Sequence, residues 1–210
     1  PEPRAAEPPR RPEAARRPEA PALGGVHAGT WDEPRFNFRQ MAILSRRAAH
    51  YLAEAGVRRG DRVLVMLPRP SPGWIAMLGL IRLGAVPVPA TLLLTERDVA
   101  YRLTTASITA VITNAEGVPK TGSFAGRKFL AGGGRPGWLD VDRGVGQGDP
   151  AFRAEPTRAD DPGMLFFTSA TTGDPKMVLH TQASYGLGHR LTGQLWLDLK
   201  SDDLHWNLSD

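Results

Sequence analysis

Cysteine is absent from this chain of 210 residues. Disulfides and thiolate metal ligands are therefore excluded, and no thiol of the chain can act as a nucleophile. Because proteins without disulfides suit a reducing compartment, we expect a cytoplasmic protein.

Long uncharged hydrophobic runs are almost as scarce. Only residues 74–94 approach the length of a membrane span. Arg82 lies near the centre of this stretch, where a charge costs roughly 2.5 to 3.5 kcal/mol on insertion scales. Gly84, Pro87 and Pro89 divide the stretch into a helix and a strand. The sequence therefore predicts no membrane span.

No block of like charge is present either. The 26 basic and 22 acidic residues are interspersed, and the formal net charge is +4. This pattern is typical of a solvated surface, so we expect no nucleic-acid partner. The alternative is a nucleic-acid-binding protein with a basic tail, whose affinity would fall steeply with salt.

Histidines and carboxylates do not form a recognisable metal-binding pattern. None of the 5 histidines pairs with another at metal-ligand spacing, and Asp202 with Asp203 is typical of a solvated turn. We therefore expect no metal site formed by the protein. His180 follows a predicted strand, which leaves two interpretations: a role near the loop described below, or packing.

Pro, Ala, Arg and Glu make up almost all of the N-terminal 22 residues. Such a composition cannot bury enough apolar area to offset chain entropy, so we expect a disordered tail over residues 1–30. The segment has no apolar signal region, and the missing initiator methionine suggests a fragment or a processed chain. Residues 31–210 are expected to form one domain, since 41% of the chain is hydrophobic.

Helix and strand patterns alternate along the first half of this domain. Apolar residues recur at helical spacing in three segments, and three short apolar runs between them have strand length. This order predicts parallel pairing, hence an α/β fold with a mostly parallel, layered sheet and flanking helices. The predicted helices are 38–55, 71–83 and 95–106, and the predicted strands are 63–67, 86–89 and 109–113.

Glycines interrupt residues 117–150, where we expect loops with short strands near residues 129–130 and 138–139. Regular structure is predicted to resume with a strand at Met164 and a second strand at 177–179. Thr181 is placed to cap a helix that runs toward Leu191. Residues 204–208 are predicted to form a last strand.

A hydroxyl-rich segment separates the strands at Met164 and Met177. It offers four side-chain hydroxyls, a glycine and an ammonium group within a few residues, which is a combination suited to binding phosphate. It differs from the Gly-x4-Gly-Lys-Ser/Thr loop because it connects two strands and does not enter a helix. The segment reads Thr168, Ser169, Ala170, Thr171, Thr172, Gly173, Asp174, Pro175 and Lys176.

Together with Phe167, this segment resembles the Tyr-Thr-Ser-Gly-Thr-Thr-Gly-x-Pro-Lys signature of the adenylate-forming superfamily, which includes the acyl-CoA synthetases and other AMP-dependent ligases. Further blocks are similar to the medium-chain acyl-CoA synthetase branch, and they follow one another in the same order. These blocks are residues 59–69, 80–85, 98–103 and 206–210. The resemblance extends from about Phe36 to the end of the chain.

The resemblance implies a two-step reaction with ATP, Mg²⁺ and coenzyme A. A carboxylic acid attacks the α-phosphate of ATP to give an acyl-adenylate, and the thiol of coenzyme A then displaces AMP. Residues 168–176 match the positions that bind the phosphates, with Lys176 as a point charge. Ala170 departs from the family, which has glycine there; a positive φ at this site would cost alanine roughly 1 to 2 kcal/mol.

Several parts of the family pattern have no counterpart in this sequence. They include the aromatic-Gly-x-Thr-Glu segment, the ribose-binding aspartate, the hinge and the C-terminal catalytic lysine. The resemblance thus implies an N-terminal fragment, inactive alone and without catalytic residues of its own. The alternative is a non-catalytic nucleotide-binding or regulatory module of the same fold.

Overall fold

Strand β3 (Arg62–Met66) pairs with two parallel neighbours in a five-stranded sheet. The computed structural model describes residues 13–24, 35–68, 71–153, 156–168, 173–200, 202–203 and 205. The strand order is β4-β3-β5-β6-β7, with β4 at Val86–Pro89, β5 at Ala110–Thr113, β6 at Arg127–Leu130 and β7 at Leu139–Asp140. All four pairings are parallel, which confirms the predicted α/β class.

Side chains of β3 alternate between two separate cores. Val63 and Val65 face one core, and Leu64 and Met66 face the other. This alternation follows from the strand period of two, and burial on both sides is typical of a parallel sheet. The unbroken apolar run from which the strand was predicted is therefore explained by two-sided burial.

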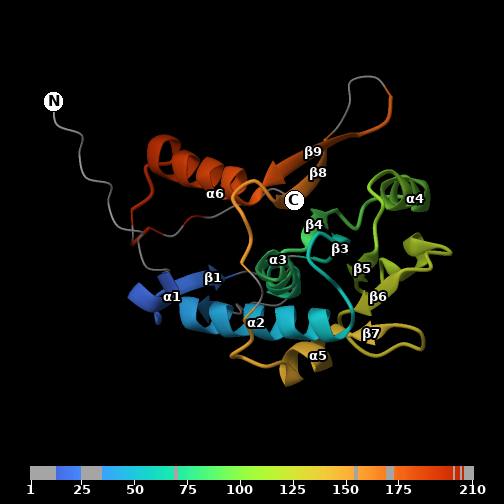
Figure 1. The fold of residues 1–210 in the computed structure, drawn as a ribbon, viewed down its shortest axis with the longest axis horizontal. Helices are drawn as coiled ribbons and strands as arrows, with labels where there is room; N and C mark the ends of the chain where they lie inside the picture. The colour runs from blue at the N-terminus through green and yellow to red at the C-terminus, as the bar shows by residue number, and fades with distance from the viewer. Residues whose placement is uncertain are drawn as a thin grey trace.

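Three helices cover one face of the sheet (Figure 1). They are α2 (Phe38–Glu54), α3 (Ser71–Leu83) and α5 (Val141–Gln147). The other face is covered by α4 (Glu96–Thr105) and by strand β8 (Pro162–Thr168), whose Leu165 enters the core with Val99 of α4. The molecule thus has the layered arrangement predicted from the order of its elements.

Capping residues define where several helices begin. Thr95 accepts a hydrogen bond from the Asp98 backbone N–H, and the Asp98 side chain accepts one from the Thr95 N–H, at 3.2 and 3.0 Å. This reciprocal capping box fixes the start of α4 as the sequence predicted. The same arrangement joins Thr181 to Ser184 at the start of α6 (Gln182–Leu191).

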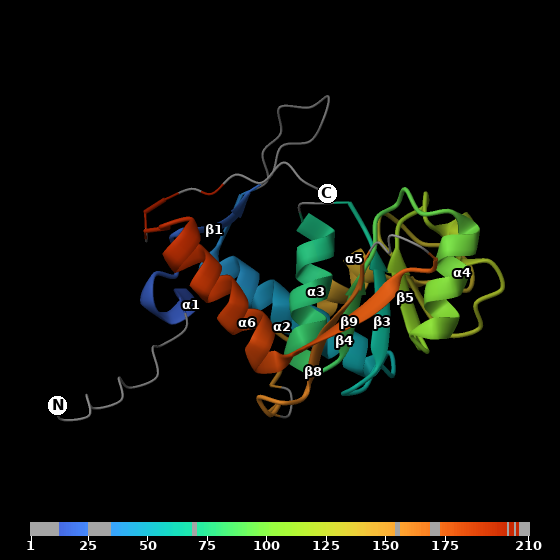
Figure 2. The ribbon, with the colours of Figure 1, turned by 90° about the horizontal axis from the view of Figure 1, so that it is seen from above.

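An antiparallel hairpin follows the parallel sheet. Strand β8 pairs with β9 (Lys176–Thr181), and β8 lies beside β4 (Figure 2). Helix α6 continues from β9 and passes into a π-helical turn, η2 (Thr192–Trp196). Both predicted strands and the predicted helix are therefore confirmed. Of residues 204–208, predicted as a last strand, only His205 is described, and it is not in a strand.

Part of the segment expected to be disordered has regular structure. Residues Glu13–Arg16 form a short helix, α1, and β1 (Pro21–Gly24) pairs with β2 (Arg35–Asn37). Backbone N–H groups of α2 also reach back to this segment: Arg39 N donates to Pro18 O at 2.9 Å. The expectation of disorder is therefore wrong for Glu13–Arg16, which is helical, and for Pro21–Gly24, whose backbone groups pair with β2. The boundary between residues 30 and 31 stays a prediction.

The glycine-rich middle of the chain has more regular structure than predicted. Strands β6 and β7 were expected, but α5 and the 3₁₀ turn η1 (Val118–Thr121) were not. Glycine disfavours a helix locally, yet Gly144 of α5 lies against the Tyr51 ring so closely that a side chain would not fit. Tertiary packing therefore outweighs local propensity here.

Within the described ranges, no helix is long and apolar enough to span a membrane.

The contact between α2 and α3 provides a test of this packing. A Cβ added at Gly79 would lie 2.7 Å from Ala48 Cβ, whereas one at Gly73 of the same helix would meet its nearest atom at 3.5 Å. We expect Gly79→Ala to destabilise the protein by about 1 to 3 kcal/mol through overpacking. Gly73→Ala should be neutral or stabilising, because alanine favours the helix. Thermal unfolding of both full-length variants measures this, and equal effects would contradict the packing.

Candidate functional site

The hydroxyl-rich segment connects the two strands of the hairpin. Thr168 is the last residue of β8 and lies opposite Lys176, the first residue of β9. The predicted position between two strands is therefore confirmed. Of the nine predicted residues, the structure describes Thr168, Gly173, Asp174, Pro175 and Lys176; the others, Ser169, Ala170, Thr171 and Thr172, lie outside the described residues.

Packing in the core fixes the strand that leads into this loop. Leu165 is 3% exposed, and Phe167 packs against the same core, so alternate side chains of β8 point toward the sheet. Gly163 approaches the backbone of Thr181 so closely that a Cβ would come within 2.8 Å of its carbonyl carbon. Strand β8 thus has little freedom to shift relative to β4 and α6.

Lys176 presents an unpaired positive charge at the loop exit. Its side chain is exposed, and within the described parts of the chain its ammonium has no hydrogen-bond or ion-pair partner. Its carbonyl accepts a hydrogen bond from the Thr168 hydroxyl at 3.4 Å. Gly173 has φ +99°, a conformation that glycine adopts without strain, and no atom lies within 4 Å of where a Cβ would be. The backbone is fixed while the charge stays available to an anion.

Helix α4 contacts the hairpin at this same end. The Tyr101 hydroxyl donates a hydrogen bond to the Pro175 carbonyl at 3.2 Å. The Arg102 guanidinium carbon lies 5.0 Å from the centre of the Phe167 ring. Burial lowers the pKa of Arg102, and nearby Asp98 partly offsets this effect. The sequence predicted α4 and its cap but gave no sign that these two side chains reach the loop.

Aromatic side chains pack on the other face of the hairpin. The Phe166 and His180 ring centres are 5.7 Å apart, and Tyr185 of α6 contacts both rings. Burial raises the pKa of Tyr185. His180 lies opposite Met164, four residues from Lys176 and hence roughly 13 Å along the strand. Of the two interpretations, the structure favours packing for His180.

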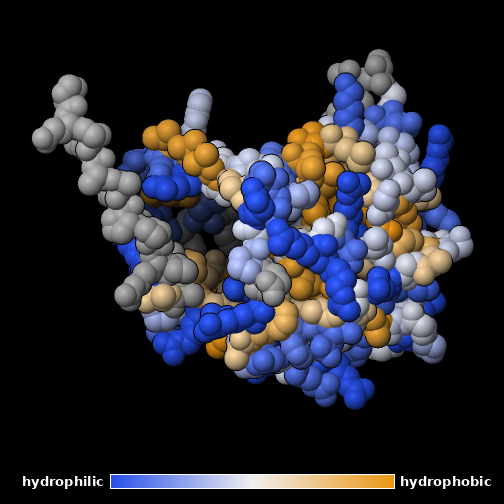
Figure 3. All heavy atoms as spheres, in the orientation of Figure 1, coloured by the Kyte–Doolittle hydropathy of each residue, from blue (hydrophilic) through white to orange (hydrophobic). Residues whose placement is uncertain are grey.

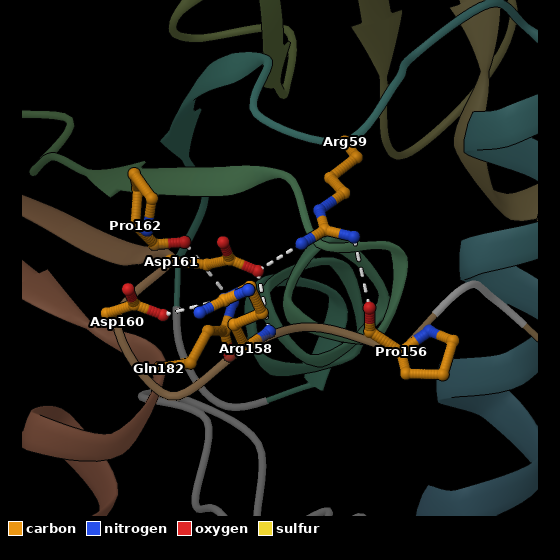
Figure 4. A network of polar contacts seen from close by, with 7 residues as sticks. All are labelled: Arg59, Pro156, Arg158, Asp160, Asp161, Pro162 and Gln182. Carbon is orange, nitrogen blue, oxygen red and sulfur yellow. Dashed lines mark hydrogen bonds and ion pairs between the residues drawn. The ribbon is translucent and has the colours of Figure 1, made fainter.

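The opposite end of the hairpin is held by an ionic network (Figure 4). Arg59, from the turn before β3, pairs with Asp161 and donates to the Pro156 carbonyl at 3.0 Å. Asp161 also accepts a hydrogen bond from the Arg158 backbone N–H, at 2.6 Å. The pKa of Asp161 is lowered, mainly by this hydrogen bond and then by Arg59, although desolvation acts in the opposite direction. The network ties the segment before β8 to the parallel sheet.

A separate cleft of about 1440 Å³ opens between α2, α3 and residues 150–153 and 156–157 (Figure 3). Its lining combines apolar rings such as Trp74 with Arg46, Arg82 and Arg153. Burial, and then the charge of Arg46, lower the pKa of Arg82. Gln182, at the base of the hairpin, lines this cleft. The cleft therefore lies at the opposite end of β9 from Lys176.

Comparison with known families then identifies the chain. The family model described as AMP-binding enzyme matches residues 11–208, which include every residue of the predicted loop. The chain belongs to the AMP-binding enzyme family. The family description names AMP as the bound nucleotide. This family match begins inside the segment that the composition suggested was a tail.

Two mammalian relatives of this chain are named as acyl-coenzyme A synthetases. The rat mitochondrial acyl-coenzyme A synthetase ACSM4 is 37% identical over 198 residues, which is 90% of this chain and 34% of the relative. The mouse mitochondrial enzyme ACSM3 is 35% identical over 190 residues, 87% of this chain and 33% of the relative. The chain thus spans about a third of the length of these relatives.

Solved structures agree on the fold. The crystal structure of an acyl-CoA synthetase from Brucella canis matches with a TM-score of 0.84 at 24% identity. The match covers 91% of this chain and 36% of that one. At this identity the likeness establishes the fold alone, and it confirms the predicted layered α/β architecture.

The relatives contradict the expected cytoplasmic localisation, since the rat and mouse proteins are both named as mitochondrial. The expectation was wrong because an absence of cysteine excludes disulfides but does not distinguish one reducing compartment from another.

The Asp161 network predicts a pH-dependent contribution to stability. The pKa of Asp161 is lower in the folded protein than in the unfolded chain. Its contribution to the free energy of unfolding is therefore complete above the unfolded pKa and is lost as the pH falls through the folded pKa. We expect Asp161→Asn to lower the thermal midpoint of the full-length protein at pH 7. The difference from wild type should shrink below about pH 4.

Asp160→Asn is the matched control for this substitution. Asp160 pairs with Arg158 at 3.3 Å, but both side chains are more than three-quarters exposed, at 77% and 78%. Exposed pairs contribute little, so the control should match wild type at both pH values. A midpoint difference for Asp161→Asn that stayed constant with pH would rule out the proposed linkage.

Proposed function

We propose that this chain contributes the pyrophosphate-binding loop of an AMP-forming acid–thiol ligase, an acyl-CoA synthetase. The full-length enzyme would activate a fatty or aromatic carboxylic acid with ATP and transfer the acyl group to coenzyme A. The observation that carries the proposal is the exposed Lys176 at the exit of a hydroxyl-rich loop, whose ammonium has no partner among the described residues, in a chain that belongs to the AMP-binding enzyme family. The similarity to acyl-coenzyme A synthetases supports the choice of reaction.

The chemistry explains why such a loop is needed. A carboxylate and the polyphosphate of ATP repel each other, so donors and positive charge must lower that repulsion while holding the α-phosphate in line with the acid. We assign this role to residues 168–176. In the proposal, the Lys176 ammonium binds the β- or γ-phosphate as a compact point charge. The hydroxyls of Ser169, Thr171 and Thr172 and the backbone N–H groups around Gly173 contact the leaving pyrophosphate.

The proposed reaction also uses Mg²⁺. Among the described residues, no group of three His, Asp or Glu side chains lies close enough to hold a metal ion. These residues therefore do not fit a metal site formed by the protein. Mg²⁺ commonly enters such enzymes bound to the substrate phosphates with few protein ligands, and we propose that it accompanies ATP here.

The domain assignment follows from the same proposal. We assign residues 31–210 to the AMP-binding domain and residues 1–30 to a preceding segment. The central parallel sheet, its two cores and the hairpin all lie within residues 31–210 and support this assignment.

Pyrophosphate exchange into ATP tests the proposed reaction. The full-length protein should catalyse carboxylate-dependent exchange with at least one acid from a panel of straight-chain carboxylates, from butanoate to dodecanoate, and benzoate. Binding of MgATP without exchange for any acid would instead support the non-catalytic nucleotide-binding alternative.

Replacing Lys176 tests the role of the loop within that reaction. We expect Lys176→Ala to lower kcat/KM for ATP in the exchange reaction by about tenfold to a hundredfold, because a hydrogen bond to a charged group contributes about 1.5 to 3 kcal/mol. Lys128→Ala is the control: Lys128 lies on β6, where its ammonium is 5.6 Å from the Trp138 ring centre. An exchange rate that fell equally in both variants would show that Lys176 has no specific role.

A further inference from the structure

One hydrogen bond joins helix α4 to the loop immediately before Lys176. The Tyr101 hydroxyl donates to the Pro175 carbonyl at 3.2 Å, across 74 residues of sequence. That carbonyl belongs to the peptide group whose N–H is that of Lys176. Because a peptide group is planar and proline fixes its own φ near −65°, holding this oxygen restricts the direction in which the chain enters Lys176.

A second contact from the same helix holds the other side of the loop. The Tyr101 and Phe167 rings meet edge to face with centres 6.1 Å apart, and Arg102 lies over the Phe167 ring. Phe167 directly precedes Thr168, where the loop begins. Two consecutive residues of α4 therefore contact the chain just before and just within the loop.

Helix α4 is itself rigidly placed. Its capping box fixes the first turn, and Val99 is fully buried in the core beside Leu165 of β8. Arg102 also donates to the Asp98 carbonyl at 2.9 Å, so its guanidinium is held from both sides. A helix anchored in this way is a fixed reference for the loop.

We propose that Tyr101 is a positioning residue of the ATP site. By holding the Pro175 carbonyl, its phenol sets the direction from which the Lys176 ammonium reaches the phosphates of ATP. This inference rests on the proposed phosphate-binding function of the loop. Tyr101 acts through the backbone of the loop, because its hydroxyl donates to the Pro175 carbonyl.

Tyr101→Phe isolates the phenol, because phenylalanine keeps the ring that contacts Phe167. In pyrophosphate exchange by the full-length protein, we expect KM for ATP to rise by about threefold to tenfold, the range of one lost hydrogen bond. The exchange kcat should change by less than about twofold, because the phosphate contact is made equally in the ground state and the transition state. Tyr51→Phe, on α2 against Phe129, is the matched control and should leave both constants unchanged.

A double-mutant cycle separates positioning from general stability. If Tyr101 acts through Lys176, Tyr101→Phe should have no further effect on KM in a Lys176→Ala background. The same fold-change in both backgrounds would overturn the proposal.

Hydrogen–deuterium exchange provides a readout that does not depend on activity. Peptides that contain residues 173–176 should exchange faster in Tyr101→Phe than in wild type or Tyr51→Phe. Unchanged hydrogen–deuterium exchange in these peptides would overturn the contact between Tyr101 and the loop. A wild-type protein that catalyses no pyrophosphate exchange with any acid would instead overturn the proposed function. The hydrogen–deuterium comparison would still decide whether the contact exists.

Discussion

Two-sided burial of strand β3 is the constraint on which the rest of the structure depends. A parallel strand must be covered on both faces, and Val63 and Leu64, which face opposite sides, are both fully buried. Helices cover the side of Val63, whereas the side of Leu64 needs both α4 and Leu165 of β8. The strand that enters the candidate site is therefore also part of the core, and it could not shift without exposing the apolar face of the sheet.

The same constraint explains why the hairpin is anchored at both ends. At its base, Arg59 links Asp161 to the turn before β3, so the sheet and the segment before β8 are tied together. At its tip, Tyr101 holds the Pro175 carbonyl from α4, which itself lies on the sheet. Both contacts therefore anchor the hairpin to the parallel sheet or to a helix that packs on it. Anchoring of this kind lowers the entropy that a binding site loses when a ligand orders it.

Local signals predicted much of this fold, and long-range contacts account for what was missed. The capping pair Thr95 and Asp98 and the apolar run of β3 each specify structure through residues close in sequence, so the helices and strands could be predicted. The contacts of Tyr101 with Pro175 and of Arg59 with Asp161 join residues 74 and 102 positions apart. Nothing local marks either pair. Helix α5 and residues 13–24 were missed for the same reason, because packing and pairing outweigh a composition that disfavours regular structure.

The way the Lys176 backbone is held also bears on the proposed binding of an anion by its side chain. Its backbone is fixed by β9, by the Thr168 hydroxyl on its own carbonyl and by Tyr101 on the preceding carbonyl. An ion pair with a carboxylate would fix the side chain as well, but a phosphate would then have to displace that partner. Charge-assisted hydrogen bonds are strong, so breaking one would offset much of what the phosphate gains. Positioning through the backbone avoids this competition, since it directs the lysine without neutralising it.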